Sequence, residues 1–152
     1  MPRPSQYFRA GAGLLIVNGR GRVLAIERAD VPGAWQLPQG GLEDSEEPLD
    51  AALREATEET RIPKGALELV QTSTEPLAYE LPPEVRSEKT GRGQVLYWFL
   101  FRFHGEDDVV DVRDGKEAKR WRWMPFAAVL DGVTEFRKPM YRRLSREFEA
   151  YL

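Results

Sequence analysis

Residues 40–62 read "GGLEDSEEPLDAALREATEETRI", a glycine pair followed by a segment with a marked excess of acidic residues. Glu55, Glu58 and Glu59 crowd into five consecutive positions of this segment. Like charges three or four residues apart on a helix cost about 0.2–0.5 kcal/mol per pair. Because this repulsion destabilises the helix, the clustering of the three carboxylates calls for a functional explanation.

The composition limits the classes of function. The chain has 152 residues, 41% hydrophobic and 31% charged, which is enough for one domain with a real core over residues 1–152. The net charge of −3 offers no general attraction to nucleic acid or to an anionic membrane. No apolar stretch approaches a membrane span, so a cytoplasmic location is expected. The absence of cysteine excludes a Cys-based zinc site, and the single histidine, His104, excludes a multi-histidine one.

Turn and strand signals outline the rest of the chain. Apolar runs at 11–17 and 22–28 flank "NGRG", which is typical of a β-hairpin. Residues 66–81 are expected to form one or two strands, 94–103 a central strand and 120–123 a short strand. Helices are expected from the N-cap Ser45 to about Thr60, and over the C-terminal residues from 134. Strands interleaved with two helices predict an α/β (α+β) fold in which a sheet lies between helices.

The acidic helix has an arc of carboxylates beside its apolar stripe. At about 100° per residue, the three glutamates cluster next to the predicted core stripe, which consists of Leu49, Leu53, Ala56 and Thr60. Convergent carboxylates are ligands for a hard divalent cation. A solvated acidic face is the alternative. The Gly-rich loop before the helix, which could bring a ligand close to the backbone, favours the metal.

The spacing of these residues resembles a known motif. Gly40, Glu46, Arg54-Glu55, Ala56, Glu58-Glu59 and Ile62 match the Nudix box of the Nudix hydrolases, position by position. Arg61 departs from the pattern, because it stands where the family has a glycine that ends the helix. A non-glycine residue with positive φ costs about 1–2 kcal/mol, so we expect a rebuilt helix end without positive φ and an intact site.

The resemblance extends over nearly the whole chain. "FRAGAG" (8–13), "WQLPQGG" (35–41), "AYELP" (78–82) and "FRKPMYRR" (136–143) resemble the branch of bacterial RNA 5′ pyrophosphohydrolases and dinucleoside polyphosphate hydrolases. This resemblance implies a single Nudix domain over residues 1–152, folded as an α/β/α sandwich with a mixed central sheet. It also implies hydrolysis of phosphoanhydride bonds by water, with Mg²⁺ or Mn²⁺ and more than one ion when substrate is bound.

The resemblance implies roles for individual residues. Glu55, Glu58, Glu59 and the carbonyl of Gly40 would be metal ligands, and Glu46 and Arg54 would form an ion pair. Glu117 would reach the metal cluster, although a surface-loop glutamate is an equally good interpretation of "DGKEAKRWRW". The sequence leaves open whether Glu55 or Glu117 acts as general base.

The substrate site is implied in the same way. Arg9 and Arg28 match phosphate-contacting positions, Tyr79 lines the phosphate site, and a base would stack on Phe136, which Arg137 and Lys138 follow. The plain alternatives are a strand-edge arginine for Arg28 and a hydrophobic staple for Phe136.

Two other functions remain to be weighed. One is a Nudix hydrolase of nucleotide sugars or other nucleoside diphosphate derivatives, and the other is a non-catalytic nucleotide-binding module of the same fold. The branch motifs argue against the first, and the complete set of box carboxylates argues against the second. The expected partner is a nucleotide polyphosphate, including the 5′ end of RNA.

Overall fold

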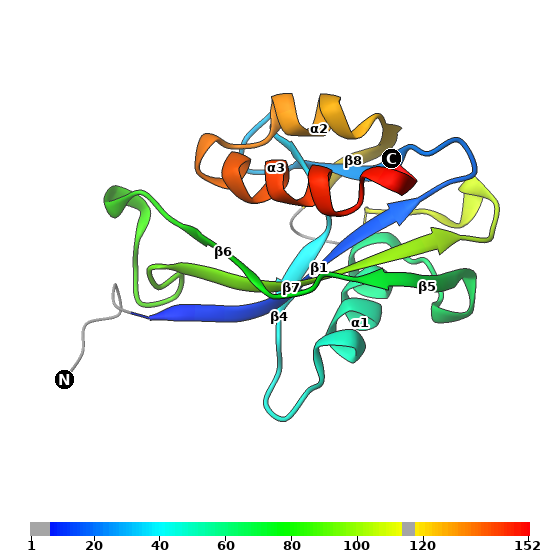
Figure 1. The fold of residues 1–152 in the computed structure, drawn as a ribbon. Helices are drawn as coiled ribbons and strands as arrows, with labels where there is room; N and C mark the ends of the chain where they lie inside the picture. Colours follow the sequence, from blue (N-terminus) through cyan, green and yellow to red (C-terminus); the bar gives the residue numbers. More distant parts are fainter. Residues whose placement is uncertain (1–6, 114–117) are drawn as a thin grey trace.

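Two long strands, β1 (Phe8–Val17) and β7 (Gly93–Phe103), pair in parallel along their whole length in the middle of the sheet. They are seen in a computed structural model that describes residues 7–113 and 118–152 (Figure 1). The sheet runs in the order β3-β2-β1-β7-β5, and β4, β6 and β8 pair with β1, β7 and β2 respectively. Its remaining strands are β2 (Val23–Arg28), β3 (Trp35–Gln36), β4 (Gln39–Gly41), β5 (Leu67–Thr72), β6 (Leu77–Glu80) and β8 (Ala118–Met124).

Helices cover both faces of this mixed sheet. Helix α1 (Pro48–Thr60) lies on one face, and α2 (Phe126–Gly132) and α3 (Lys138–Glu147) lie on the other (Figure 1). The strand residues alternate between the two cores, so that Leu14 packs on the α1 side and Leu15 on the α3 side. The predicted α+β fold with helices on both faces of a mixed sheet is confirmed.

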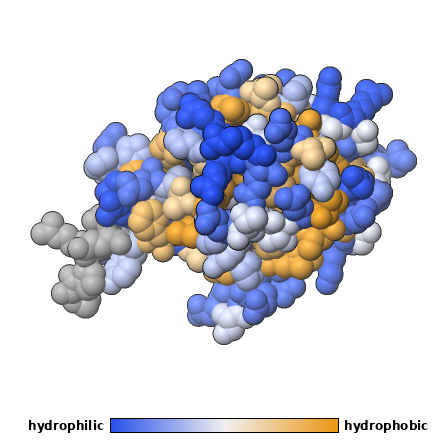
Figure 2. Space-filling model, in the orientation of Figure 1, coloured by the Kyte–Doolittle hydropathy of each residue, from blue (hydrophilic) through white to orange (hydrophobic). Residues whose placement is uncertain are grey.

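The local signals in the sequence explain most of these elements. In the β1–β2 hairpin, the side-chain oxygen of Asn18 accepts hydrogen bonds from the backbone N–H groups of Arg20 (2.9 Å) and Arg22 (3.1 Å). Gly21 supplies the positive φ of 75° that the turn needs. In α3, Met140 and Leu144 are buried, whereas the solvent face carries arginines; on the face drawn in Figure 2, hydrophilic side chains gather over α3.

Three details differ from the sequence-based expectations. Helix α1 begins at Pro48 after Glu47, because Ser45 has a φ of 64° and cannot act as N-cap. The buried face of α1 is centred on its alanines and includes Glu55 and Glu59, whereas Leu49 and Leu53 are only partly buried. Helix α2 was not predicted, since its seven residues are too few to show a helical period.

The end of α1 contradicts the expectation of a rebuilt terminus. Arg61 has φ 64° and ψ 4°, and its backbone N–H donates to the carbonyl of Thr57 at 3.0 Å, as glycine does in the usual left-handed cap. The reversal brings the next residue, Ile62, into the core with no exposed surface. Burial of Ile62 therefore outweighs the cost of a left-handed arginine.

We expect Arg61→Gly to stabilise the fold by about 1 kcal/mol, because glycine adopts positive φ without strain. Thermal unfolding should show a melting temperature about 2–4 °C higher for a chain of this size. Arg61→Ala is the matched control, since it removes the guanidinium but keeps the strained conformation. If the glycine variant melts no higher than the alanine variant, the left-handed cap carries no strain.

Across the residues described, the structure contains no helix that is both long and apolar enough to cross a membrane.

Candidate active site

The acidic helix α1 meets strand β4 at Gly40. Gly40 lies in β4, which pairs with β1 opposite Ala12, and a Cβ added at Gly40 would overlap with the carboxyl group of Glu55. The buried hydroxyl of Tyr141 on α3 accepts a hydrogen bond from the backbone N–H of Leu37 at 2.9 Å, which ties the loop to the opposite helix layer. The backbone of Gly40 and the carboxyl group of Glu55 therefore share one small, firmly held space.

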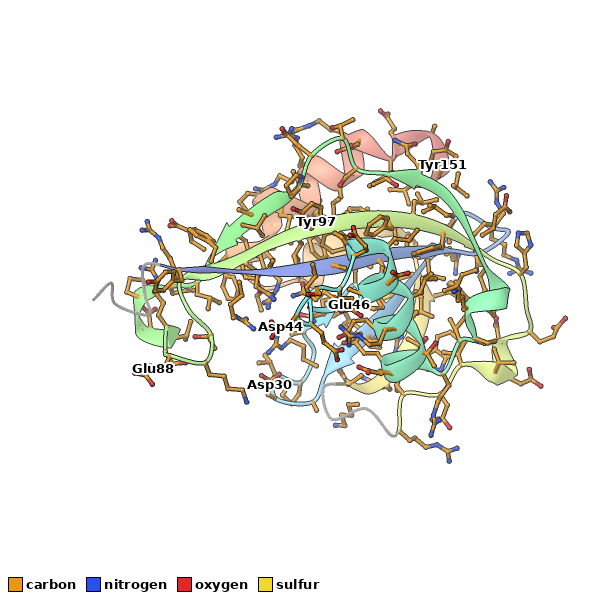
Figure 3. The ribbon with its side chains drawn as sticks, turned by 90° about the horizontal axis from the view of Figure 1, so that it is seen from below. Asp30, Asp44, Glu46, Glu88, Tyr97 and Tyr151 are labelled. Atoms are coloured by element: carbon orange, nitrogen blue, oxygen red, sulfur yellow. The ribbon has the colours of Figure 1, made fainter. Side chains whose placement is uncertain are left out.

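Arg54 organises the carboxylates of α1. Its Nε and Nη2 donate to the two carboxylate oxygens of Glu46, both at 2.8 Å, which confirms the predicted ion pair. Its Nη1 lies 2.9 Å from Glu55 Oε1 and 3.2 Å from Glu58 Oε2, so the crowded charges are relieved within the helix itself. The hydrogen bonds from Arg54, and then the one from the backbone of Glu43, lower the pKa of Glu46 to about 2. Figure 3 shows Glu46 against the helix.

The oxygen donors at this point suit a hard divalent cation. Glu55 and Glu59 are buried, whereas the side chain of Glu58 is 57% exposed and turned to Arg54. Within residues 7–113 and 118–152, no three acidic or histidine side chains are gathered so as to hold a metal ion. Carboxylates and a glycine carbonyl are nevertheless the kind of oxygen donor that a hard divalent cation takes, and in this structure the Arg54 guanidinium contacts Glu55 and Glu58. Glu117 lies outside the described residues.

A cleft of about 630 Å³ opens beside this point. Gly40 and Gly41 form part of its wall, so the cleft adjoins the carboxylates of α1. Of the residues singled out from the sequence, the cleft is lined by Arg9, Arg28, Gly40, Tyr79, Phe136 and Arg137. Lys138 is not among the lining residues, and its ammonium group contacts Glu135 at 2.7 Å.

An aromatic pair and a buried arginine form one side of the cleft. The rings of Tyr79 and Phe136 stack with centroids 5.7 Å apart, and the guanidinium carbon of Arg137 lies 4.8 Å and 4.7 Å from those two centroids. Such cation–π contacts contribute about 0.5–2 kcal/mol each. Because Arg137 covers part of the pair, only the ring surface that the arginine leaves open is available to a ligand.

A chain of hydrogen bonds links this arginine to the residue before Gly40. Arg137 Nη2 donates to the Tyr79 hydroxyl (3.2 Å), which donates to Gln94 Oε1 (2.5 Å), and Gln39 Nε2 donates to the same Gln94 oxygen (2.7 Å). Arginine is always a donor, so it sets the direction of every bond in the chain. Gln39 and Gln94 were missed from the sequence, although a glutamine at the start of an apolar strand was a usable signal.

The other two arginines are already bound to protein groups. Arg9 Nε donates to the carbonyl of Thr90 at 2.8 Å, in the loop between β6 and β7. Arg28 makes two hydrogen bonds to the carboxylate of Asp30, at 2.8 and 2.7 Å, and a third to Gln36 Oε1 at 3.2 Å. Asp30 also lines the cleft, and it was not singled out from the sequence.

The fold and this acidic-helix site define the class of protein. The model of the NUDIX domain family matches residues 7–144, and the chain therefore belongs to the Nudix family. Members of this family generally use divalent metal ions.

Individual proteins with a known name or structure resemble this chain over almost its whole length. The RNA pyrophosphohydrolase of Cereibacter sphaeroides is 37% identical over 150 residues, which cover 95% of this chain and 93% of the relative. The protein of the same name from Sphingopyxis alaskensis is 37% identical over 146 residues, covering 93% of this chain and 92% of the relative. Among solved structures, a Caenorhabditis elegans Ap4A hydrolase has the same fold, with a TM-score of 0.72 and 21% identity over 94% of this chain and 99% of that one.

Proposed function

We propose that this Nudix hydrolase is a metal-dependent pyrophosphohydrolase of nucleotide polyphosphates. Its substrates are the triphosphate or diphosphate at the 5′ end of RNA and dinucleoside polyphosphates. The observation that carries the proposal is the cleft, where Gly40 beside Glu55, three arginines and a stacked aromatic pair line one space. The relatives named RNA pyrophosphohydrolase, which match almost end to end, support the same substrate class.

Each part of the cleft has a role in this reaction. Glu55, Glu58, Glu59 and the Gly40 carbonyl would hold the metal ions, with Glu117 as a further ligand. When bound, Mg²⁺ or Mn²⁺ neutralises the phosphate oxygens and lowers the pKa of the attacking water. Arg9, Arg28 and Arg137 balance charge along the phosphate chain, and Lys138 adds positive charge at its edge. The water oxygen would form a bond to one phosphorus as the phosphoanhydride bond to the leaving phosphate breaks, and the proton of the water would pass to a carboxylate, Glu55 or Glu117.

The competing functions are less well supported. A nucleotide-sugar hydrolase would share the acidic helix but has no counterpart among the relatives compared above, which are named for RNA or for Ap4A. A binding-only module would not need two buried carboxylates beside Gly40, because taking carboxylates out of water is costly even where an arginine such as Arg54 pairs with one of them. We propose a single domain that acts in the cytoplasm, on soluble nucleotides or RNA, with no DNA or membrane partner.

The test is a side-by-side assay of diadenosine tetraphosphate and 5′-triphosphorylated RNA, with identification of the products. We expect a nucleoside triphosphate plus a monophosphate from the first, and phosphate or pyrophosphate from the second, and no turnover with a chelator present. A nucleotide sugar and ADP-ribose serve as comparison substrates. Cleavage of those two alone would reject the substrate class and leave the family unchanged.

Phe136→Ala is expected to raise the Michaelis constant for both substrates by roughly fivefold or more, because base stacking contributes about 1–3 kcal/mol. Turnover should change less, since stacking acts in the ground state and the transition state alike. Phe136→Leu keeps an apolar side chain against Tyr79 without a ring, and it separates stacking from packing. Equal Michaelis constants for wild type and both variants would place the base elsewhere.

A further inference from the structure

The Arg28–Asp30 pair places a carboxylate on the guanidinium group of an arginine that lines the cleft. Both oxygens of Asp30 face Arg28, through Nε at 2.8 Å and Nη2 at 2.7 Å, and both residues line the cleft. This is the two-pronged geometry with which arginine binds a phosphate group. Figure 3 shows Asp30 on the loop that follows β2.

A second cation of the cleft also acts on Asp30. The hydrogen bonds from Arg28 are the main reason that the pKa of Asp30 lies below its ordinary value, and the positive charge of Arg137 lowers it further. Asp30 is therefore ionised at neutral pH and lies in the field of two arginines that line the cleft. A bound phosphate group would occupy the same field.

Hydrogen bonds fix the backbone of the loop that contains Asp30, while the Asp30 side chain can rotate away from Arg28. The buried carboxylate of Glu27 accepts from the backbone N–H of Gly33 (3.0 Å) and from Arg120 (2.9 Å), and the N–H of Arg28 donates to the carbonyl of Ala34 (2.9 Å). These bonds close the loop at both ends. The side chain of Asp30 is 63% exposed, so it can rotate from Arg28 into solvent without disturbing the loop.

We propose that Asp30 competes with phosphate ligands for Arg28 and so sets how strongly the cleft binds a phosphate group. The proposal rests on the proposed function, in which these arginines face the phosphate chain. A ligand held by phosphate contacts alone, such as inorganic pyrophosphate, must displace Asp30 and gains little. A nucleotide polyphosphate gains further binding from the metal site and the stacked base. Because either ligand must displace Asp30 to reach Arg28, Asp30 lowers the affinity of the cleft for a phosphate group in both.

The competition can be measured without turnover. Binding of inorganic pyrophosphate is titrated calorimetrically in the presence of a chelator, so that only the arginines are available to it. Asp30→Asn is expected to bind pyrophosphate about fivefold more tightly than wild type, a gain of about 1 kcal/mol. Asp131→Asn, on the exposed surface of α2, removes the same charge away from the cleft and should change the affinity little.

A double-mutant cycle tests whether Arg28 is the residue for which Asp30 and pyrophosphate compete. In an Arg28→Gln background the gain from Asp30→Asn should disappear, because the residue for which Asp30 competes is gone. Weaker binding by Asp30→Asn would mean that Asp30 positions Arg28 for the ligand, and the proposal would be wrong. An unchanged affinity, or a gain matched by Asp131→Asn, would also overturn it. None of these outcomes depends on which nucleotide the enzyme hydrolyses, so the substrate assay fails or succeeds separately.

Discussion

Gly40→Ala is expected to lower turnover by about a hundredfold or more while the protein remains folded. A Cβ at this position would overlap with the Glu55 carboxyl group, which is buried and hydrogen-bonded to Arg54. The end of the glutamate side chain has to move, and a displacement of about 1 Å in a catalytic group can cost a hundredfold in rate. The measurement is the turnover number at saturating substrate and Mg²⁺, together with a melting curve.

Gly41→Ala is the matched control for Gly40→Ala. The nearest atom to a Cβ at Gly41 is the carbonyl oxygen of Ala10 at 3.9 Å, an ordinary contact. This variant should melt close to wild type and lose much less activity. If Gly40→Ala retains wild-type turnover, the Glu55 carboxylate does not need the position that the structure gives it.

Glu59→Gln and Glu58→Gln are each expected to reduce turnover by orders of magnitude, because each removes a charged ligand from the proposed metal site. Neither should unfold the protein. Glu59 is buried on the same side of α1 as Glu55, so a neutral amide there relieves repulsion in the metal-free state. Glu58 is largely exposed, and its pair with Arg54 is of the helix type that contributes about 0.3–0.5 kcal/mol.

Glu47→Gln provides the comparison for the glutamate variants. Glu47 is exposed at the N-cap of the same helix and makes no capping hydrogen bond through its side chain. The Glu47→Gln variant should retain turnover. That result would show that the losses come from the metal site and not from the removal of one negative charge. Near-wild-type activity of both other variants at saturating Mg²⁺ would remove the catalytic assignment.

Regular elements were predictable wherever burial imposed a period on the sequence. The run at 94–103 became the central strand β7, because a strand covered by helices on both faces is apolar throughout. The end of α1 was not predictable in this way, since local preference argued against a left-handed arginine and only the burial of Ile62 decided the matter. Tertiary packing outweighed a local cost of about 1–2 kcal/mol.

The candidate site likewise contains some features that the sequence predicts and others that it does not. The acidic helix was readable because its glutamates lie within one short segment, and the relation of Glu46 to Arg54 follows from the motif. The residues Gln39, Gln94 and Arg137 lie in three distant segments of the sequence, so no short motif predicts the hydrogen bonds that link them. Asp30 was overlooked for a related reason, because an aspartate in a Pro- and Gly-rich loop looks like an ordinary turn residue.

The parallel pairing of β1 with β7 has a consequence for how the chain is made. Strand β1 cannot complete its pairing with β7 until residues 93–103 have also left the ribosome. At typical synthesis rates of 5–20 residues per second, that delay is roughly 4–17 s. During this time the β1–β2 hairpin and the acidic helix exist without the middle of the sheet. Nascent chains are therefore expected to resist proteolysis only after β7 has emerged, which makes the tunnel exit the place where this fold is most exposed to misassembly.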